Sequence, residues 1–167
     1  MADPVVEVQT NQGSFQITLD TERAPKSVEN FLKYVDDNHY AGTVFHRIIP
    51  NFMIQGGGYD EQLERKSTKA PVENESTNKV ANKRGTVAMA RTGDPHSATA
   101  QFFVNVVDNA SLDHRGGADG WGYSVFGTVT QGMDVVDKIK EVKTGPKGPF
   151  QKDAPVDTVV INSIKRV

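Results

Sequence analysis

The sequence contains no cysteine among its 167 residues, which excludes disulfide bonds, thiol nucleophiles and cysteine-ligated metal. It has no apolar run near the roughly 20 residues that a membrane-spanning helix needs. It also lacks an excess of one charge, because 19 basic residues are scattered among 21 acidic ones, for a net charge of -2. Binding to nucleic acid or to an acidic membrane surface is therefore not expected.

Other chemical signatures are missing as well. The four histidines are His39, His46, His96 and His114. They lack the HxH and HxxxH spacings of metal ligands, and no carboxylate cluster accompanies them. No GxSxG motif marks a serine hydrolase, and no lysine follows the glycines at 56–58 to complete a phosphate-binding loop. We therefore expect neither a metal ion nor a cofactor.

The organisation of the chain is simple. Its length fits one domain, and its 37% hydrophobic and 24% charged residues are typical of a soluble globular protein. No internal repeat or linker divides it, so we expect a single domain over residues 1–167 and a monomer. The first residues, MADPVVEVQT, have neither the basic nor the long apolar stretch of a signal peptide, so we expect a cytoplasmic location.

Short segments with alternating apolar and polar residues recur along the chain and predict strands. These segments are 5–10, 14–20, 43–49, 52–57, 86–91, 102–107, 123–130 and 158–167. Only 24–37 and 132–142 place apolar residues at helical spacing. Two helices cannot cover both faces of an eight-stranded sheet, whereas a sheet closed on itself leaves no exposed edge. We therefore predict a mainly β protein, a closed barrel with helices plugging its ends.

The intervals between these elements are predicted to lack regular structure. Residues 59–84 have few large apolar side chains and no periodicity, so they read as a surface loop. Residues 114–122 and 143–155 are rich in Gly and Pro and predict turns.

One stretch, FHRIIPNFMIQGG at 45–57, sets Arg47 and Gln55 among large apolar side chains. Burying either group without partners would cost several kcal/mol, so both must face water or a bound molecule. Similar mixtures occur in MARTGDPHSATAQFF, ASLDH and GWGYSVFG. Together these segments supply His46, Phe52, Met53, Ala90, Arg91, Gln101, Phe103, Leu112, Tyr123 and Phe126. Apolar side chains with a few converging polar groups are typical of a binding groove.

The stretches FHRIIPNFMIQGG, MARTGDPHSATAQFFVNV and SVFGTV are similar to the cyclophilin family of peptidyl-prolyl cis/trans isomerases. The similarity covers nearly the whole chain, and HSATAQFF and GWGY most resemble the cytosolic bacterial branch. The resemblance implies an eight-stranded antiparallel barrel capped by two helices. It also implies an isomerase that assists protein folding, whose partners are proline-containing peptides and unfolded or flexible protein segments.

The resemblance also assigns roles to residues. It makes Arg47 the catalytic arginine and makes Phe52, Met53, Phe103 and Leu112 the proline pocket. It places Gln55, Ala90, Arg91, Gln101, His46 and Tyr123 along the bound peptide. The family usually has an aromatic residue, often Trp, where this chain has Ser111, and often a His where it has Tyr123. Only weak binding of cyclosporin is therefore expected.

The chemistry of the reaction suits an arginine. Rotation about an X–Pro bond breaks amide resonance, makes no new bond and needs no nucleophile. A donor aimed at the proline nitrogen stabilises only the twisted amide, and the guanidinium of Arg47 is always charged and rich in donors.

Two alternatives stay open at this point. A proline-segment binding module or a chaperone-like protein, without important turnover, would use the same groove but would not need Arg47. A barrel that encloses a small ligand would need a hollow interior. The predicted inward residues that argue against this are Phe31, Ile48, Met89, Phe102, Val104 and Phe126.

Overall fold

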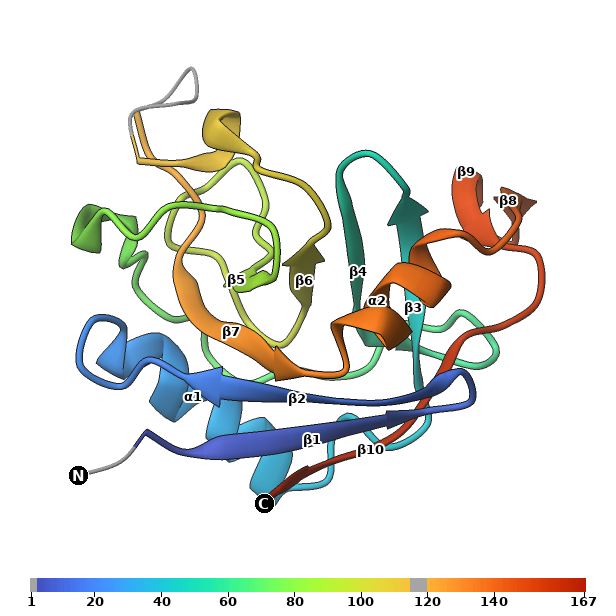
Figure 1. Ribbon diagram of the computed structural model, residues 1–167, viewed down its shortest axis with the longest axis horizontal. Helices are drawn as coiled ribbons and strands as arrows, with labels where there is room; N and C mark the ends of the chain where they lie inside the picture. Colours follow the sequence, from blue (N-terminus) through green and yellow to red (C-terminus); the bar gives the residue numbers. More distant parts are fainter. Residues whose placement is uncertain (1–2, 115–119) are drawn as a thin grey trace.

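The computed structural model describes residues 3–114 and 120–167, and eight of its strands form a closed barrel. The order around the barrel is β1, β10, β3, β4, β6, β5, β7, β2, and every neighbouring pair is antiparallel. The strands are β1 (Val5–Thr10), β2 (Gly13–Leu19), β3 (Thr43–Ile49), β4 (Met53–Asp60), β5 (Thr86–Met89), β6 (Phe102–Asn105), β7 (Val125–Gln131) and β10 (Val160–Arg166). The predicted eight-stranded antiparallel barrel is confirmed (Figure 1).

Two helices pack against the barrel, as predicted. Helix α1 (Pro25–Asp36) contacts β10 and β7, and α2 (Met133–Lys140) contacts β2, β3 and β4. Each helix has one apolar face, and Phe31 of α1 and Ile139 of α2 are fully buried in the same core cluster as the barrel strands. The helices therefore complete a core that the strands alone would leave open. Neither helix has the length and hydropathy to cross a membrane, and the same holds for every helix in the described part of the chain.

The barrel interior is filled with side chains. The ring of Phe31 lies 5.7 Å from that of Phe102 and 5.0 Å from that of Phe126. The six predicted inward residues, Phe31, Ile48, Met89, Phe102, Val104 and Phe126, are all at most 2% exposed and belong to one cluster. The interior therefore holds packed core, and a binding site must lie on the outer wall.

One predicted turn region is structured. Residues 143–155 contain strands β8 (Thr144–Lys147) and β9 (Phe150–Pro155), which pair as a separate two-stranded sheet. The prediction of turns alone was wrong here, because this small sheet is held by a contact with a residue far away in the sequence, which local patterns do not show. The ring of Phe150 stacks on His46 of β3, 5.2 Å away.

The interval 59–84 is more ordered than the surface loop that was predicted. It includes the end of β4 and the short 3-10 helix η1 (Ser76–Asn78). Asn74, Ser76 and Asn82 are buried in it, and the amide of Asn74 donates a 2.9 Å hydrogen bond to the Gly122 carbonyl. Local hydrophobicity misses such segments, because buried polar side chains order them. Of the predicted turn at 114–122, residues 115–119 lie outside the described part of the chain.

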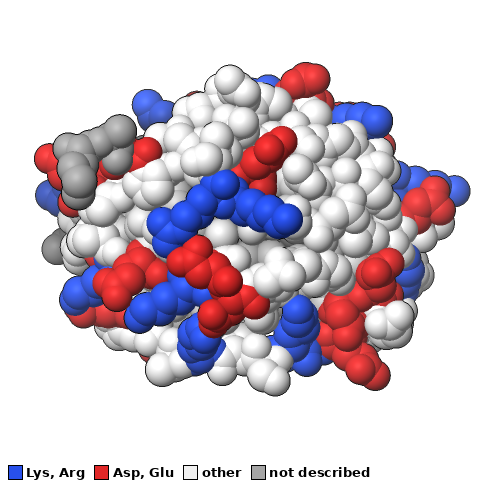
Figure 2. Space-filling model, turned by 90° about the horizontal axis from the view of Figure 1, so that it is seen from below, with Lys and Arg blue, Asp and Glu red and all other residues white. Residues whose placement is uncertain are grey.

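Charges on the side formed by α1, β1 and β10 are mixed in sign. Figure 2 shows Lys and Arg interleaved with Asp and Glu on this face. Several of them are paired, including Arg166 with Asp36 at 2.7 Å and Lys26 with Glu73 at 2.6 Å. This face therefore presents no extended field of one sign.

Candidate active site

A bulge in β3 explains the polar residues in the stretch 45–57. Phe45 lies opposite Gly56, and Arg47 lies opposite Gln55, so His46 is an extra residue between two paired positions. Phe45 and Ile48 both point into the barrel core. An extra residue interrupts the normal alternation, and two consecutive side chains, His46 and Arg47, therefore lie on the outer wall.

Arg47 opens onto a groove of about 120 Å³ on this wall. The groove is lined by Arg47, Phe52, Met53, Gln55, Ala90, Arg91, Phe103, Leu112 and Tyr123. These nine residues come from β3, β4, β6, the turn between β3 and β4, the short 3-10 helix η2 (Ala110–Leu112) and the segments after β5 and before β7. The structure therefore gathers in one place most of the site residues that the sequence suggested.

The apolar floor of the groove is a second, smaller core. Met53 and Phe103 are 2% and 4% exposed and pack with Ala88 and Val125 outside the barrel interior. The partly buried side chains of Phe52, Leu112 and Tyr123 pack against this cluster. The floor is therefore held by buried neighbours on one side while its rim stays open to a ligand.

A buried amide network behind the floor was not predicted. Asn109 donates to the Phe52 carbonyl and to the Asn105 side chain, both at 2.8 Å. Asn105 in turn donates to the side chain of Asn82 at 3.1 Å. These residues fix the turn that carries Phe52. Their signal in the sequence was weak, because isolated asparagines are ordinary loop residues.

The polar wall is formed by a short chain of side chains. Arg47 approaches the Gln55 carbonyl oxygen at 3.5 Å, the limit of a hydrogen bond, so its guanidinium is only loosely held. Gln55 donates a 2.9 Å hydrogen bond to Gln101. Gln101 lies in the adjoining pocket rather than in the groove itself. Gly58 leaves room for Gln101, because a Cβ at this position would lie 2.4 Å from the Gln101 side chain and displace it.

Arg91 braces two loops beside the groove. Its guanidinium donates to the carbonyls of Thr92, Trp121 and Gly122 at 2.9, 3.2 and 3.3 Å. It also lies over the ring of Tyr123, 4.7 Å from the centroid. The side chain therefore fixes the rim formed by the segments after β5 and before β7.

His46, like Gln101, is a predicted binding residue that is absent from the lining of the groove. It is 6% exposed and packs between Tyr59 and Phe150, with ring centroids 4.6 and 5.2 Å away. The extra residue of the bulge turns it toward β9, away from the groove lining. Burial, together with the charge of Arg47, lowers the pKa of His46 from 6.5 to about 4.

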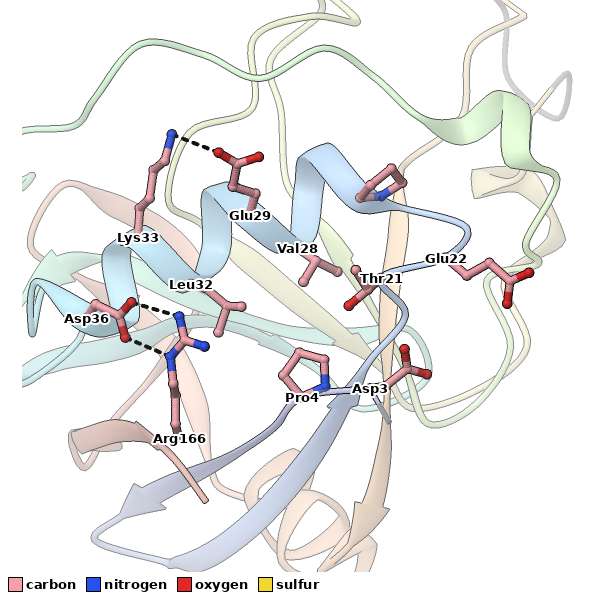
Figure 3. Close-up of a pocket in the computed structure, with 11 residues that line it drawn as sticks. Asp3, Pro4, Thr21, Glu22, Val28, Glu29, Leu32, Lys33, Asp36 and Arg166 are labelled. Atoms are coloured by element: carbon pink, nitrogen blue, oxygen red, sulfur yellow. Dashed lines mark hydrogen bonds and ion pairs between the residues drawn. The ribbon is translucent and has the colours of Figure 1, made fainter. Parts of the chain in front are cut away.

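A larger hollow lies elsewhere, beside α1 (Figure 3). It has a volume of about 800 Å³, and none of the predicted site residues line it. Its two basic residues are paired across the surface, Arg166 with Asp36 and Lys33 with Glu29. We place the candidate site in the smaller groove, because an arginine, the amide of Gln55 and an apolar floor converge there. Among the described residues, no three His, Asp or Glu side chains gather as metal ligands would.

Comparison with known proteins identifies the family of the chain. The family of cyclophilin type peptidyl-prolyl cis-trans isomerases matches residues 5–166. The chain belongs to this family.

Two bacterial relatives are similar over almost their whole length. Peptidyl-prolyl cis-trans isomerase cyp18 of Streptomyces antibioticus is 57% identical over 161 residues, 96% of each chain. Peptidyl-prolyl cis-trans isomerase B of Escherichia coli K12 is 52% identical over 161 residues, 96% of this chain and 98% of the relative. This cyclophilin is therefore a peptidyl-prolyl cis/trans isomerase, and an interpretation as a pure binding module is not favoured.

Solved structures share the fold. A cyclophilin type peptidyl-prolyl cis-trans isomerase of Cryptosporidium parvum superposes with a TM-score of 0.78 at 24% identity, covering 99% of this chain and 98% of its own. That protein has also been solved in the presence of the dipeptide Ala-Pro. Cyclophilins act on proline-containing peptides, and the barrel described above is their fold.

Proposed function

We propose that Arg47 is the catalytic residue of this cyclophilin and that the groove around it holds the X–Pro segment. The observation that carries the proposal is the position of Arg47. The bulge sets its exposed guanidinium at the edge of the Met53–Phe103 floor, next to the amide of Gln55. Arg91 is the other arginine that lines the groove, but its guanidinium is held by backbone carbonyls, those of Thr92, Gly93, Trp121 and Gly122.

The groove supplies the two things that the rotation needs. The barrier of about 18–20 kcal/mol arises from amide resonance. The apolar floor holds the pyrrolidine ring while Gln55 and the backbone near Ala90 anchor the flanking peptide, so rotation is confined to one bond. No covalent step is required.

Arg47 then acts on the twisted state alone. When the amide twists, the proline nitrogen becomes pyramidal and its lone pair accepts a hydrogen bond that the planar ground state cannot accept. A donor that stabilises only this state raises kcat. Lowering the barrier by about 6 kcal/mol corresponds to roughly a ten-thousandfold acceleration, which one charged hydrogen bond plus orientation could supply.

The proposal extends to the cellular setting. The substrates are proline-containing segments of unfolded or flexible proteins, and the enzyme works as a single-domain monomer in the cytoplasm. The position of the groove on the outer wall of the barrel supports the first part, because a segment of another protein can reach it there. Sedimentation and cell fractionation test the other two.

The decisive experiment replaces Arg47. Arg47→Ala should lower kcat/KM for cis/trans exchange of a short X–Pro peptide, measured by NMR, at least a hundredfold. Its thermal unfolding should stay close to wild type, since the side chain is exposed. Arg23→Ala is the matched control, because Arg23 is an exposed arginine that pairs with Asp20 and is not among the residues that line the groove. Rates of Arg47→Ala within twofold of wild type would refute the assignment.

A further inference from the structure

A second pocket adjoins the proposed proline groove. Its volume is about 90 Å³, and it shares Gln55, Ala90 and Arg91 with the groove. Arg65 and Gln101 are among the residues that complete its wall. The volume is several times the roughly 10–15 Å³ that one water requires, so the pocket has room for the polar head of a side chain.

The hydroxyl groups of Ser97 and Thr92 in this pocket are already engaged in hydrogen bonds. The Ser97 hydroxyl donates to the Asp94 carbonyl at 2.6 Å. It also accepts from the backbone N–H and from the hydroxyl of Thr92, at 2.9 and 2.8 Å. The carbonyl of Thr99 accepts from Asn30 at 2.7 Å. These groups shape the pocket but have little capacity left for a ligand.

Arg65 is the charged group of this pocket whose side chain has no partner among the described residues. Its backbone is held by a bridge to Tyr59 of β4. Its side chain is exposed and makes no ion pair or hydrogen bond with any residue in the described ranges. Arginine offers five N–H donors and no acceptor, so this wall of the pocket selects a hydrogen-bond acceptor, and an anion most strongly.

The charged residues that line the two pockets also favour an anionic ligand. Arg47, Arg65 and Arg91 line them, and no Asp or Glu is found among their described lining residues. The chain as a whole carries a net charge of -2. The positive groove is therefore a local feature set against the overall charge.

We propose that the second pocket binds an acidic side chain of the substrate, Asp or Glu, a few residues along the chain from the proline. Arg65 is the residue that determines this specificity. The inference rests on the proposed function, since it takes the groove as the place where the proline sits. Because an extended chain advances about 3.3 Å per residue, adjoining pockets receive side chains that lie close together in the peptide.

The test is a set of peptides that differ only in charge. Each contains one X–Pro bond and carries Glu, Gln or Lys at one position, from three residues before the proline to three after it. For wild type, we expect kcat/KM to be about fivefold higher with Glu than with Gln at one position, and lower again with Lys, as for an exposed ion pair. The preference should shrink in 1 M salt, which screens charges beyond about 3 Å.

Three variants make the test specific. Arg65→Gln should reduce the ratio of kcat/KM for the Glu peptide to that for the Gln peptide to about one. Arg65→Lys should keep part of the preference. Arg23→Gln removes one exposed positive charge elsewhere and should keep all of it. A ratio near one at every position in wild type, or a preference that survives in Arg65→Gln, overturns the inference.

Failure of this inference is distinguishable from failure of the proposed function. If Arg47→Ala loses turnover of all peptides while wild type shows no preference for Glu, the groove is correctly placed and the acidic subsite is not. If Arg47→Ala turns over every peptide as wild type does, the groove itself is wrongly assigned.

Discussion

Mild acid should destabilise this cyclophilin through one buried histidine. His46 has its pKa lowered from 6.5 to about 4, first by burial and then by the charge of Arg47. Between these two pH values the unfolded chain binds a proton at this position that the folded chain does not bind. Stability therefore rises with pH across this window. The contribution of His46 is fully present above pH 6.5 and is lost as the pH falls toward 4.

The size of the effect follows from the width of the window. Each pH unit in which the two states differ by one proton changes the free energy of unfolding by about 1.4 kcal/mol. Lowering the pH from 6.5 to about 4 should therefore reduce the free energy of unfolding by about 3 kcal/mol. This is a large part of the 5–15 kcal/mol that is typical of a domain. Burial also lowers the pKa of His39, which adds a loss of the same sign. The two histidines must be separated by mutation.

Urea unfolding at several pH values from 7.5 to 4.5 measures the effect. His46→Phe keeps an aromatic ring against Phe150 and Tyr59 but cannot take up a proton. Between pH 7.5 and 4.5 its free energy of unfolding should therefore fall by about 2–3 kcal/mol less than that of wild type. His39→Phe is the matched control, and it should retain the loss of stability in acid that is due to His46. The range ends at pH 4.5 because carboxylates such as Asp36 and Asp137, whose pKa values are lowered by Arg166 and Arg84, begin to lose their pairs below it. Parallel curves for wild type and His46→Phe would refute the reasoning.

Two further outcomes are expected. Phe102 and Phe103 are adjacent on β6, but Phe102 faces the barrel core and Phe103 faces the groove floor. Phe102→Ala and Phe103→Ala should each lower the free energy of unfolding by about 3–5 kcal/mol. Only Phe103→Ala should also raise KM for an X–Pro peptide. Equal KM values in the two folded variants would show that Phe103 does not belong to the site. Ser111 is exposed on η2 beside Leu112 of the groove, and its short hydroxyl cannot cover apolar surface as an indole does. Wild type should therefore bind cyclosporin weakly and Ser111→Trp roughly a hundredfold more tightly, which titration calorimetry measures; tight binding by wild type, or no gain in the variant, contradicts this.

Local patterns were sufficient to predict the barrel. Alternation in segments such as 5–10 and 102–107, and helical spacing in 24–37, each reflect which face meets the core, so the strands and helices could be located. The closed barrel could be predicted from the number of elements, because two helices are too few to cover both faces of an open eight-stranded sheet. The interior residues, Phe31 among them, were predicted for the same reason.

The site was harder to predict, because parts of it depend on a register that no local pattern shows. The bulge at His46 places two consecutive residues outside, and alternation alone would have put one of them in the core. The partner of His46, Phe150, lies more than a hundred residues away in a segment that reads as turns. Arg65 was missed because it lies in a polar interval where one arginine looks like any other.

The pairing of β1 with β10 has a consequence for how the chain is made. Val6 lies opposite Ile17 on one side and Arg166 on the other, so one partner of β1 is close in sequence and the other is distant. Contacts of such long sequence separation slow folding. At about 5–20 residues per second, a ribosome needs roughly 8 to 30 s after β1 to deliver β10. Until β10 arrives, the edges of β1 and β3 that pair with it are exposed and can pair with other strands. These two edges are therefore where a nascent chain of this enzyme most needs protection from aggregation.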